Sequence, residues 1–131
     1  MKGARVKGAR VRALWWLVSL AYMGVMFYLS AQSGDQVGIP APWDKLAHLC
    51  EYGALGFLLS RATGRWVLGW VLAAWYGALD EVHQAFVPGR EAGIADWWAD
   101  LAGSFVGSYL AASLRPLRFG RSEASKARGH D

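Results

Sequence analysis

The chain has 131 residues, of which 54% are hydrophobic and 18% charged, so it is long enough for one domain and too apolar for a disordered chain. Half of the charged side chains lie in the first twelve and the last seventeen residues, and the formal net charge of +4 therefore arises at the ends. This distribution argues against a nucleic-acid-binding protein, and it indicates that the residues between the two charged ends lie in a lipid bilayer.

The first apolar segment spans residues 13–31 and contains no charged side chain. At about 1.5 Å per residue, a helix of this length can cross the roughly 30 Å hydrocarbon core of a bilayer. The basic residues before it also fit the start of a secretory signal peptide, but the apolar run is long for such a signal. We therefore predict a retained first helix, which ends in a polar stretch containing Gly34, Gly38 and Pro40.

Three further apolar segments follow, and none shows the alternation of apolar and polar residues typical of a strand. They cover residues 43–60, 66–86 and 94–114 and are separated by Arg61 to Arg65 and by Pro88 and Gly89. The predicted fold class is all-α, an integral membrane four-helix bundle formed by residues 13–114. Residues 1–12 are a basic segment before it, and residues 115–131 are a basic tail that we expect to be disordered.

The basic residues predict the orientation of the bundle. Every Lys and Arg except Lys45 and Arg90 lies at the chain ends or between the second and third segments. With four spans these positions share one side of the membrane, which the positive-inside rule assigns to the cytoplasm, together with both termini. Gly103 and Gly107 allow a close helix approach, which we expect inside the bundle, with a dimer seam as the alternative.

Ionisable side chains within the spans are costly in hydrocarbon and therefore indicate a functional site. On the predicted orientation they all lie in the outer half of their helices, and their helical spacing places most of them on one face of each helix. Arg90 follows the third segment, where a guanidinium can bind a carboxylate or a phosphate. The predicted ligand-binding residues are Lys45, His48, Glu51, Tyr52, Asp80, Glu81, His83, Gln84, Arg90, Asp96 and Asp100. Of the two glutamates, at least one is expected to face the lipid head groups instead.

A purely structural interpretation is that Lys45 and Arg90 neutralise the embedded carboxylates and fix the helix order. Two cations do not balance five carboxylates, so some carboxylates hold protons, a histidine is charged, or a cation binds. The pairs His48-x-x-Glu51 and Asp80-x-x-His83 are similar to ligand pairs in carboxylate-bridged metal bundles. A metal site formed by His48, His83 and one or two carboxylates is therefore an alternative interpretation of these residues.

No organic cofactor is predicted, because the sequence contains no nucleophile-elbow serine, no glycine-rich phosphate loop and no dinucleotide fingerprint. The lone cysteine, Cys50, excludes an intrachain disulfide. Whether the chain is an enzyme is left open by the sequence. If it is one, His48, Asp80 and His83 are the expected acid and base groups.

Three blocks of sequence together resemble the VanZ-like membrane proteins: DKLAHLCEYGALG from Asp44, DEVHQAFVPGR from Asp80 and DWWADLAGSFVG from Asp96. Their order and spacing match the family, which often has Asn where this chain has Asp100. The resemblance implies a small multi-pass protein of the bacterial inner membrane. It also implies a link to glycopeptide resistance, since the named relative is associated with resistance to teicoplanin.

The leading hypothesis is a VanZ-like membrane protein that binds an anionic lipid or a lipid-linked cell-wall intermediate in a pocket open to the outer leaflet. Arg90 and Lys45 would hold the anionic head group. The alternative is a membrane-embedded, optionally metal-assisted hydrolase or transferase acting on a lipid or polyprenyl phosphate. A third interpretation is a structural accessory that packs against an envelope complex or forms a homo-oligomer.

Overall fold

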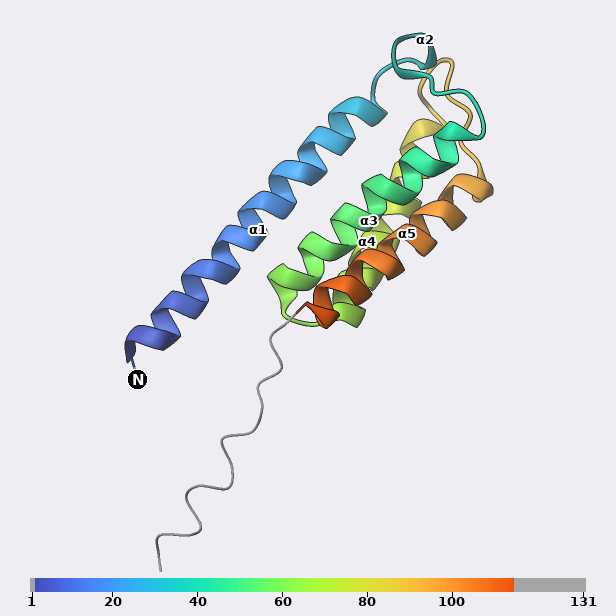
Figure 1. The fold of residues 1–131 in the computed structure, drawn as a ribbon. Coiled ribbons are helices and arrows are strands. Elements are labelled where there is room, and N and C mark those ends of the chain that lie inside the picture. The colour runs from blue at the N-terminus through green and yellow to red at the C-terminus, as the bar shows by residue number, and fades with distance from the viewer. Residues whose placement is uncertain (1, 115–131) are drawn as a thin grey trace, which may run out of the picture.

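The computed structural model describes residues 2–114, and the tail predicted to begin at residue 115 lies outside them. The described residues form helices and no strand, which confirms the all-α class. The helices are α1 (Lys2–Ser30), α2 (Gly34–Val37), α3 (Trp43–Thr63), α4 (Trp66–Gln84) and α5 (Ile94–Ser113). In Figure 1, α3, α4 and α5 form a close group and α1 runs along one side of it.

The helix ends lie where glycine and proline interrupt the chain. Gly64 follows α3 with a φ of 77°, and its N–H donates to the carbonyl of Ser60 at 3.0 Å. This is the left-handed cap that glycine adopts without steric cost. The first helix begins much earlier than the apolar segment does, because α1 continues through the basic residues from Lys2 onward. Alanine, lysine and arginine are good helix formers, and these residues simply extend the helix.

Helices α3 and α5 pack at very short range because glycines line their contact. A methyl group at Gly103 would overlap the carbonyl of Leu49, and one at Gly107 would overlap the carbonyl of Gly53. The Ser108 hydroxyl donates to the carbonyl of Gly56 at 3.1 Å. The two glycines of α5 therefore pack inside the bundle, as predicted.

The interior of the described residues is unusually polar. Its buried side chains include Tyr52, Leu55 and Leu59. Polar groups are buried beside them, namely Ser60, Asp80, Gln84, Asp96, Asp100, Ser104 and Ser108. Large apolar side chains face outward instead, among them Leu17, Phe27, Val67, Trp75, Leu79, Val82, Val106 and Leu110. This is the reverse of the distribution in a water-soluble protein.

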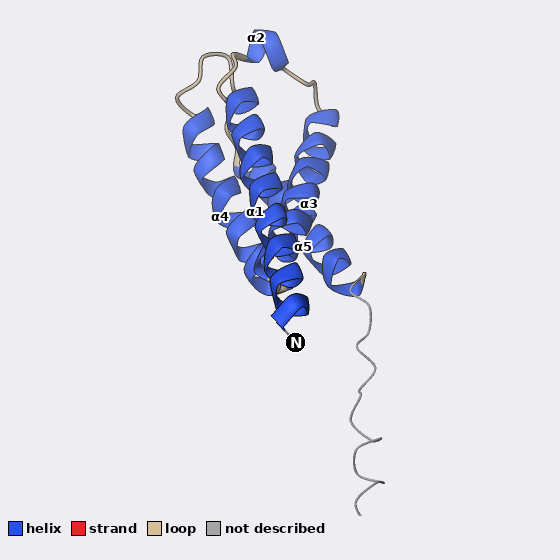
Figure 2. Cartoon of the chain, turned by 90° about the vertical axis from the view of Figure 1, so that its left-hand side faces the viewer, coloured by secondary structure: helices blue, strands red, loops and turns tan. Residues whose placement is uncertain are grey.

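Among the helices of residues 2–114, α1 alone, over Gly3–Ser30, is both long and apolar enough to cross a membrane by length and composition. The helices α3, α4 and α5 have 21, 19 and 20 residues, but acidic and histidine side chains lower their mean hydropathy. Figure 2 shows that the start of α1 and the end of α5 lie at one end of the molecule, with α2 at the other. The predicted polar residues belong to the α2 end.

Candidate functional site

A pocket of about 370 Å³ opens at the α2 end between α1, α3 and α4. Its wall combines apolar side chains, backbone of the α2 loop and several ionisable groups. The ionisable side chains lining it are Asp44, His48, Glu51, Asp80, Arg90, Glu91 and Asp96. Six of the predicted site residues therefore share one cavity: His48, Glu51, Asp80, Gln84, Arg90 and Asp96.

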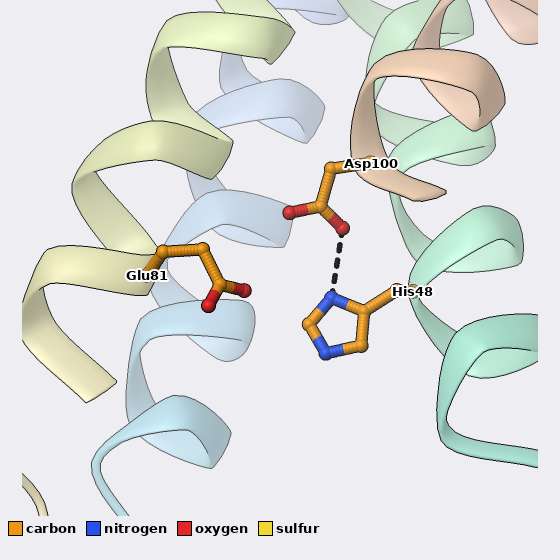
Figure 3. Close-up of side chains that lie close together, drawn as sticks. All are labelled: His48, Glu81 and Asp100. Atoms are coloured by element: carbon orange, nitrogen blue, oxygen red, sulfur yellow. Dashed lines mark hydrogen bonds and ion pairs between the residues drawn. The ribbon is translucent and has the colours of Figure 1, made fainter. Parts of the chain in front are cut away.

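His48 and Asp100 form a pair across the α3–α5 contact. The Nδ1 atom of His48 lies 2.7 Å from Oδ1 of Asp100, and the Asp100 side chain is completely buried. Figure 3 shows the second ring nitrogen of His48 pointing away from Asp100. A histidine held in this way can transfer a proton at its free nitrogen while the carboxylate fixes its orientation.

Glu81 of α4 points toward this pair (Figure 3). Its Oε2 accepts a hydrogen bond from the N–H of Gly93 at 3.0 Å, immediately before α5. Ligand atoms of His48, Glu81 and Asp100 lie within 4.8 Å of one another. From the sequence we expected at least one of the two glutamates to face the lipid head groups; in the structure Glu81 faces the interior and Glu51 lines the pocket.

Lys45 is bound to two carboxylates. Its Nζ contacts Oδ2 of Asp44 at 2.7 Å and pairs across to α5 with Asp96. The lysine thus joins the first turns of α3 and α5, and its charge is already compensated by protein. Asp44 was missed by the sequence prediction, although it stands next to Lys45 and one turn before His48.

Tyr52, Asp80 and Gln84 form a buried network between α3 and α4. Oδ2 of Asp80 accepts a hydrogen bond from the Gln84 amide at 3.0 Å and one from the Tyr52 hydroxyl at 3.4 Å. These two donors stabilise the carboxylate in place of a cation. Tyr76, one turn before Asp80 on α4, instead donates its hydroxyl to the Met23 carbonyl of α1 at 2.7 Å.

His83 and Arg90, both predicted site residues, contact α1 through their side chains. The ring of His83 stacks on Phe27 with a centroid separation of 4.8 Å, and its Nδ1 lies 3.4 Å from the Ser30 hydroxyl. Arg90 donates to the carbonyls of Leu29 and Gln32 at 2.9 Å and 3.2 Å. Arg90 therefore caps the end of α1 while it lines the pocket, whereas His83 is not among the lining residues.

Backbone of the α2 loop also lines the pocket, through Gly34, Gly38 and their neighbours. The N–H of Gly34 donates to the Pro88 carbonyl at 3.2 Å, so this loop lies against the turn that carries Arg90. The sequence contains no signal for this contact, because the loop has no chemistry-bearing motif and its position depends on tertiary packing. Together the walls offer many hydrogen-bond acceptors and one guanidinium.

Comparisons with known proteins identify one family. The model of the VanZ/LLP1 family matches residues 15–115, which covers α3, α4, α5, the second half of α1 and the whole pocket. No curated protein and no solved structure matches the chain.

Proposed function

The chain belongs to the VanZ/LLP1 family, and from this premise we propose that it is a multi-pass protein of the bacterial inner membrane. In our proposal it binds the head group of an outer-leaflet lipid or lipid-linked cell-wall intermediate. The observation that carries the proposal is the pocket of about 370 Å³, lined by carboxylates, His48 and Arg90, at one end of a bundle with an apolar exterior.

The side-chain distribution supports a lipid environment for all four long helices. Apolar side chains face outward along α3, α4 and α5 as well as α1, and small polar side chains fill the contacts between helices. At about 1.5 Å per residue, α3, α4 and α5 are each roughly 30 Å long, which matches the hydrocarbon core. Small residues at helix contacts are also typical of membrane bundles.

The charge distribution supports the orientation. The basic start of α1 and the turn between α3 and α4 lie at one end of the bundle, and α2 lies at the other (Figure 1). The pocket belongs to the α2 end, because residues of the α2 loop line it. By the positive-inside rule the basic end faces the cytoplasm. The pocket then opens at the level of the outer leaflet, where lipid-linked cell-wall intermediates are used.

The chemistry of the walls favours a head group that carries hydrogen-bond donors as well as a phosphate. Arg90 keeps guanidinium N–H groups beyond the two used by α1 and can bind a phosphate oxygen. The pocket carboxylates repel a second anion but accept hydrogen bonds from hydroxyl or ammonium groups. Met26, Leu29 and Ile39 add an apolar wall for the first carbons of a lipid chain.

Native mass spectrometry of the full chain with defined lipids tests this proposal. The parent should retain phosphatidylethanolamine or a polyprenyl diphosphate sugar, and Arg90→Ala and Glu51→Gln should retain at least about tenfold less. His83→Ala is the matched control, since His83 lies outside the pocket, and it should bind like the parent. Equal retention by all four proteins would exclude the pocket as the binding site.

A second function, hydrolysis or transfer at a lipid or polyprenyl phosphate, is favoured by one observation. His48 lines the pocket while Asp100 holds its Nδ1 atom, which is the arrangement of a general base. Release of phosphate from a polyprenyl diphosphate by the parent, lost in His48→Ala, would establish this activity. Binding without turnover would leave head-group binding as the function.

A link to glycopeptide resistance follows from the family alone, and we propose it on that basis. Expression of the chain in a susceptible host should raise the inhibitory concentration of teicoplanin. If susceptibility to teicoplanin is unchanged while the chain is expressed at a normal level, this family member does not confer resistance.

A further inference from the structure

We propose that His48, Glu81 and Asp100 form a binding site for one divalent transition-metal cation of the Zn²⁺ class. The three residues come from α3, α4 and α5, and each offers a ligand atom within 4.8 Å of the others. Figure 3 shows the two carboxylates and the imidazole facing a common space between the helices. The site differs from that predicted from the sequence, because His83 contacts α1 and Glu81 takes its place.

Two buried carboxylate oxygens of this cluster can serve as ligand atoms, because no protein group uses them. Oδ2 of Asp100 and Oε1 of Glu81 are both inaccessible to solvent and have no hydrogen-bond partner. The Asp100 side chain is completely buried, and its second oxygen points toward α4, the helix that carries Glu81. A buried carboxylate oxygen without a partner is strongly unfavourable unless a proton or a cation compensates it.

The chargeable groups nearby do not reach these two oxygens, since His48 contacts the other carboxylate oxygen of Asp100, Oδ1. Lys45 pairs with Asp44 and Asp96, and Arg90 donates to carbonyls at the end of α1. Within residues 2–114, no lysine or arginine pairs with Glu81 or Asp100. A divalent cation would neutralise both carboxylates at once and leave His48 uncharged as its third ligand.

The donor set favours a transition metal over calcium or magnesium. One imidazole nitrogen with two carboxylate oxygens suits Zn²⁺, Mn²⁺ or Fe²⁺, whereas Ca²⁺ and Mg²⁺ prefer oxygen ligands alone. Ligands about 2.1 Å from an ion lie roughly 3.4 Å apart, so ligand atoms separated by up to 4.8 Å must approach by up to about 1.4 Å on binding. Rotation of the Glu81 side chain can supply this movement, while its bond to Gly93 holds the carboxylate close.

Zinc titration of the purified, tag-free full chain in detergent tests the proposal without any lipid ligand. After removal of metal with a chelator, calorimetry with zinc chloride should show one saturable site per chain, and elemental analysis should find one zinc. Glu81→Gln and Asp100→Asn should each weaken binding at least about tenfold. Glu91→Gln is the matched control, because Glu91 lines the pocket outside the cluster and should bind zinc like the parent.

Thermal unfolding distinguishes lost ligands from a lost fold. Zinc should raise the Tm of the parent and of Glu91→Gln and should leave that of Glu81→Gln unchanged, even if the variant is less stable without metal. Absence of a saturable site in the folded parent would overturn the proposal, and so would unchanged affinity in Glu81→Gln. Because no lipid is present, neither outcome bears on head-group binding.

Discussion

The close contact between α3 and α5 predicts that Gly103→Ala destabilises the bundle and disturbs the site at the same time. The nearest atoms to a methyl group at Gly103 are backbone atoms of Leu49, which cannot rotate away. Because non-bonded carbon contacts lie near 3.5 Å, the helices must separate by roughly 1 Å or more. Overpacking of this kind costs about 1–3 kcal/mol, and the gain in helix propensity offsets up to about 1 kcal/mol.

Because rigid backbone atoms block the methyl group, we take the upper half of this cost, about 2–3 kcal/mol, so the net loss expected for Gly103→Ala is about 1–2 kcal/mol of unfolding free energy. Denaturant titration in mild micelles can measure it through the fluorescence of the eight tryptophans. The separation should also weaken the 2.7 Å contact between His48 and Asp100, because Leu49 adjoins His48 and Gly103 lies one turn from Asp100. Zinc affinity should therefore fall together with stability.

Gly24→Ala is the control, since a methyl group at Gly24 on α1 meets no atom within 4 Å. It should leave stability unchanged or raise it by up to about 1 kcal/mol. A Gly103→Ala variant as stable as the parent would refute the described α3–α5 packing. Equal losses in both variants would show that glycine flexibility matters and not the contact.

Three further predictions follow from other contacts. Tyr52→Phe removes a hydrogen bond to Asp80 and should lower the unfolding free energy by about 0.5–1.5 kcal/mol, measured by the same titration; an unchanged value would mean that Gln84 alone satisfies the carboxylate. Arg90→Lys cannot donate to two carbonyls from one planar group, so hydrogen exchange at the end of α1 should accelerate, and unchanged protection would contradict the capping role. After Cys50 is replaced, Glu91→Cys and Ala4→Cys each give a chain with one cysteine. An impermeant maleimide added to intact cells should label the cysteine at position 91 but not the one at position 4, and the reverse pattern would show that the proposed orientation is wrong.

The helices could be predicted from the sequence because strong local signals mark their ends. Charged turns and glycine or proline follow each apolar segment, and the observed ends of α3, α4 and α5 differ from the predicted ones by only a few residues. The start of α1 was not predicted, because an apolar segment marks the hydrocarbon region and not the helix itself. The short helix α2 was also missed, since four residues carry no periodic pattern.

The candidate site was predicted less completely than the helices. Spacing alone placed Asp80, His83 and Gln84 on one face of α4 and left Glu81 beside it. In the structure α4 contacts α1 on one side and α3 and α5 on the other, so His83 and Glu81 meet different neighbours. Which face of a helix meets which partner depends on the arrangement of the whole bundle, and a single helical period does not contain that information.

Arg90 illustrates the same limit. Its position after Pro88 and Gly89 indicated a guanidinium at the mouth of the pocket, and the structure places it there. Its hydrogen bonds to Leu29 and Gln32 could not be foreseen, because they depend on where α1 ends in space. A residue predicted as a ligand for an anion is thereby also part of the scaffold.

The sparse attachment of α1 has a consequence for how a lipid would reach the pocket. Ser19, Met26 and Ser30 are the buried residues of this helix among those described. Beyond them it is held by hydrogen bonds that involve Tyr22, Tyr76 and Arg90 and by ring contacts of Phe27 and Trp15. Because α1 buries few residues and packs less closely on α3 and α4 than α3 and α5 pack on each other, it is the wall that costs least to displace. An amphiphile would then enter sideways from the surrounding leaflet, with its tail remaining in oil throughout, and would never have to cross the aqueous phase.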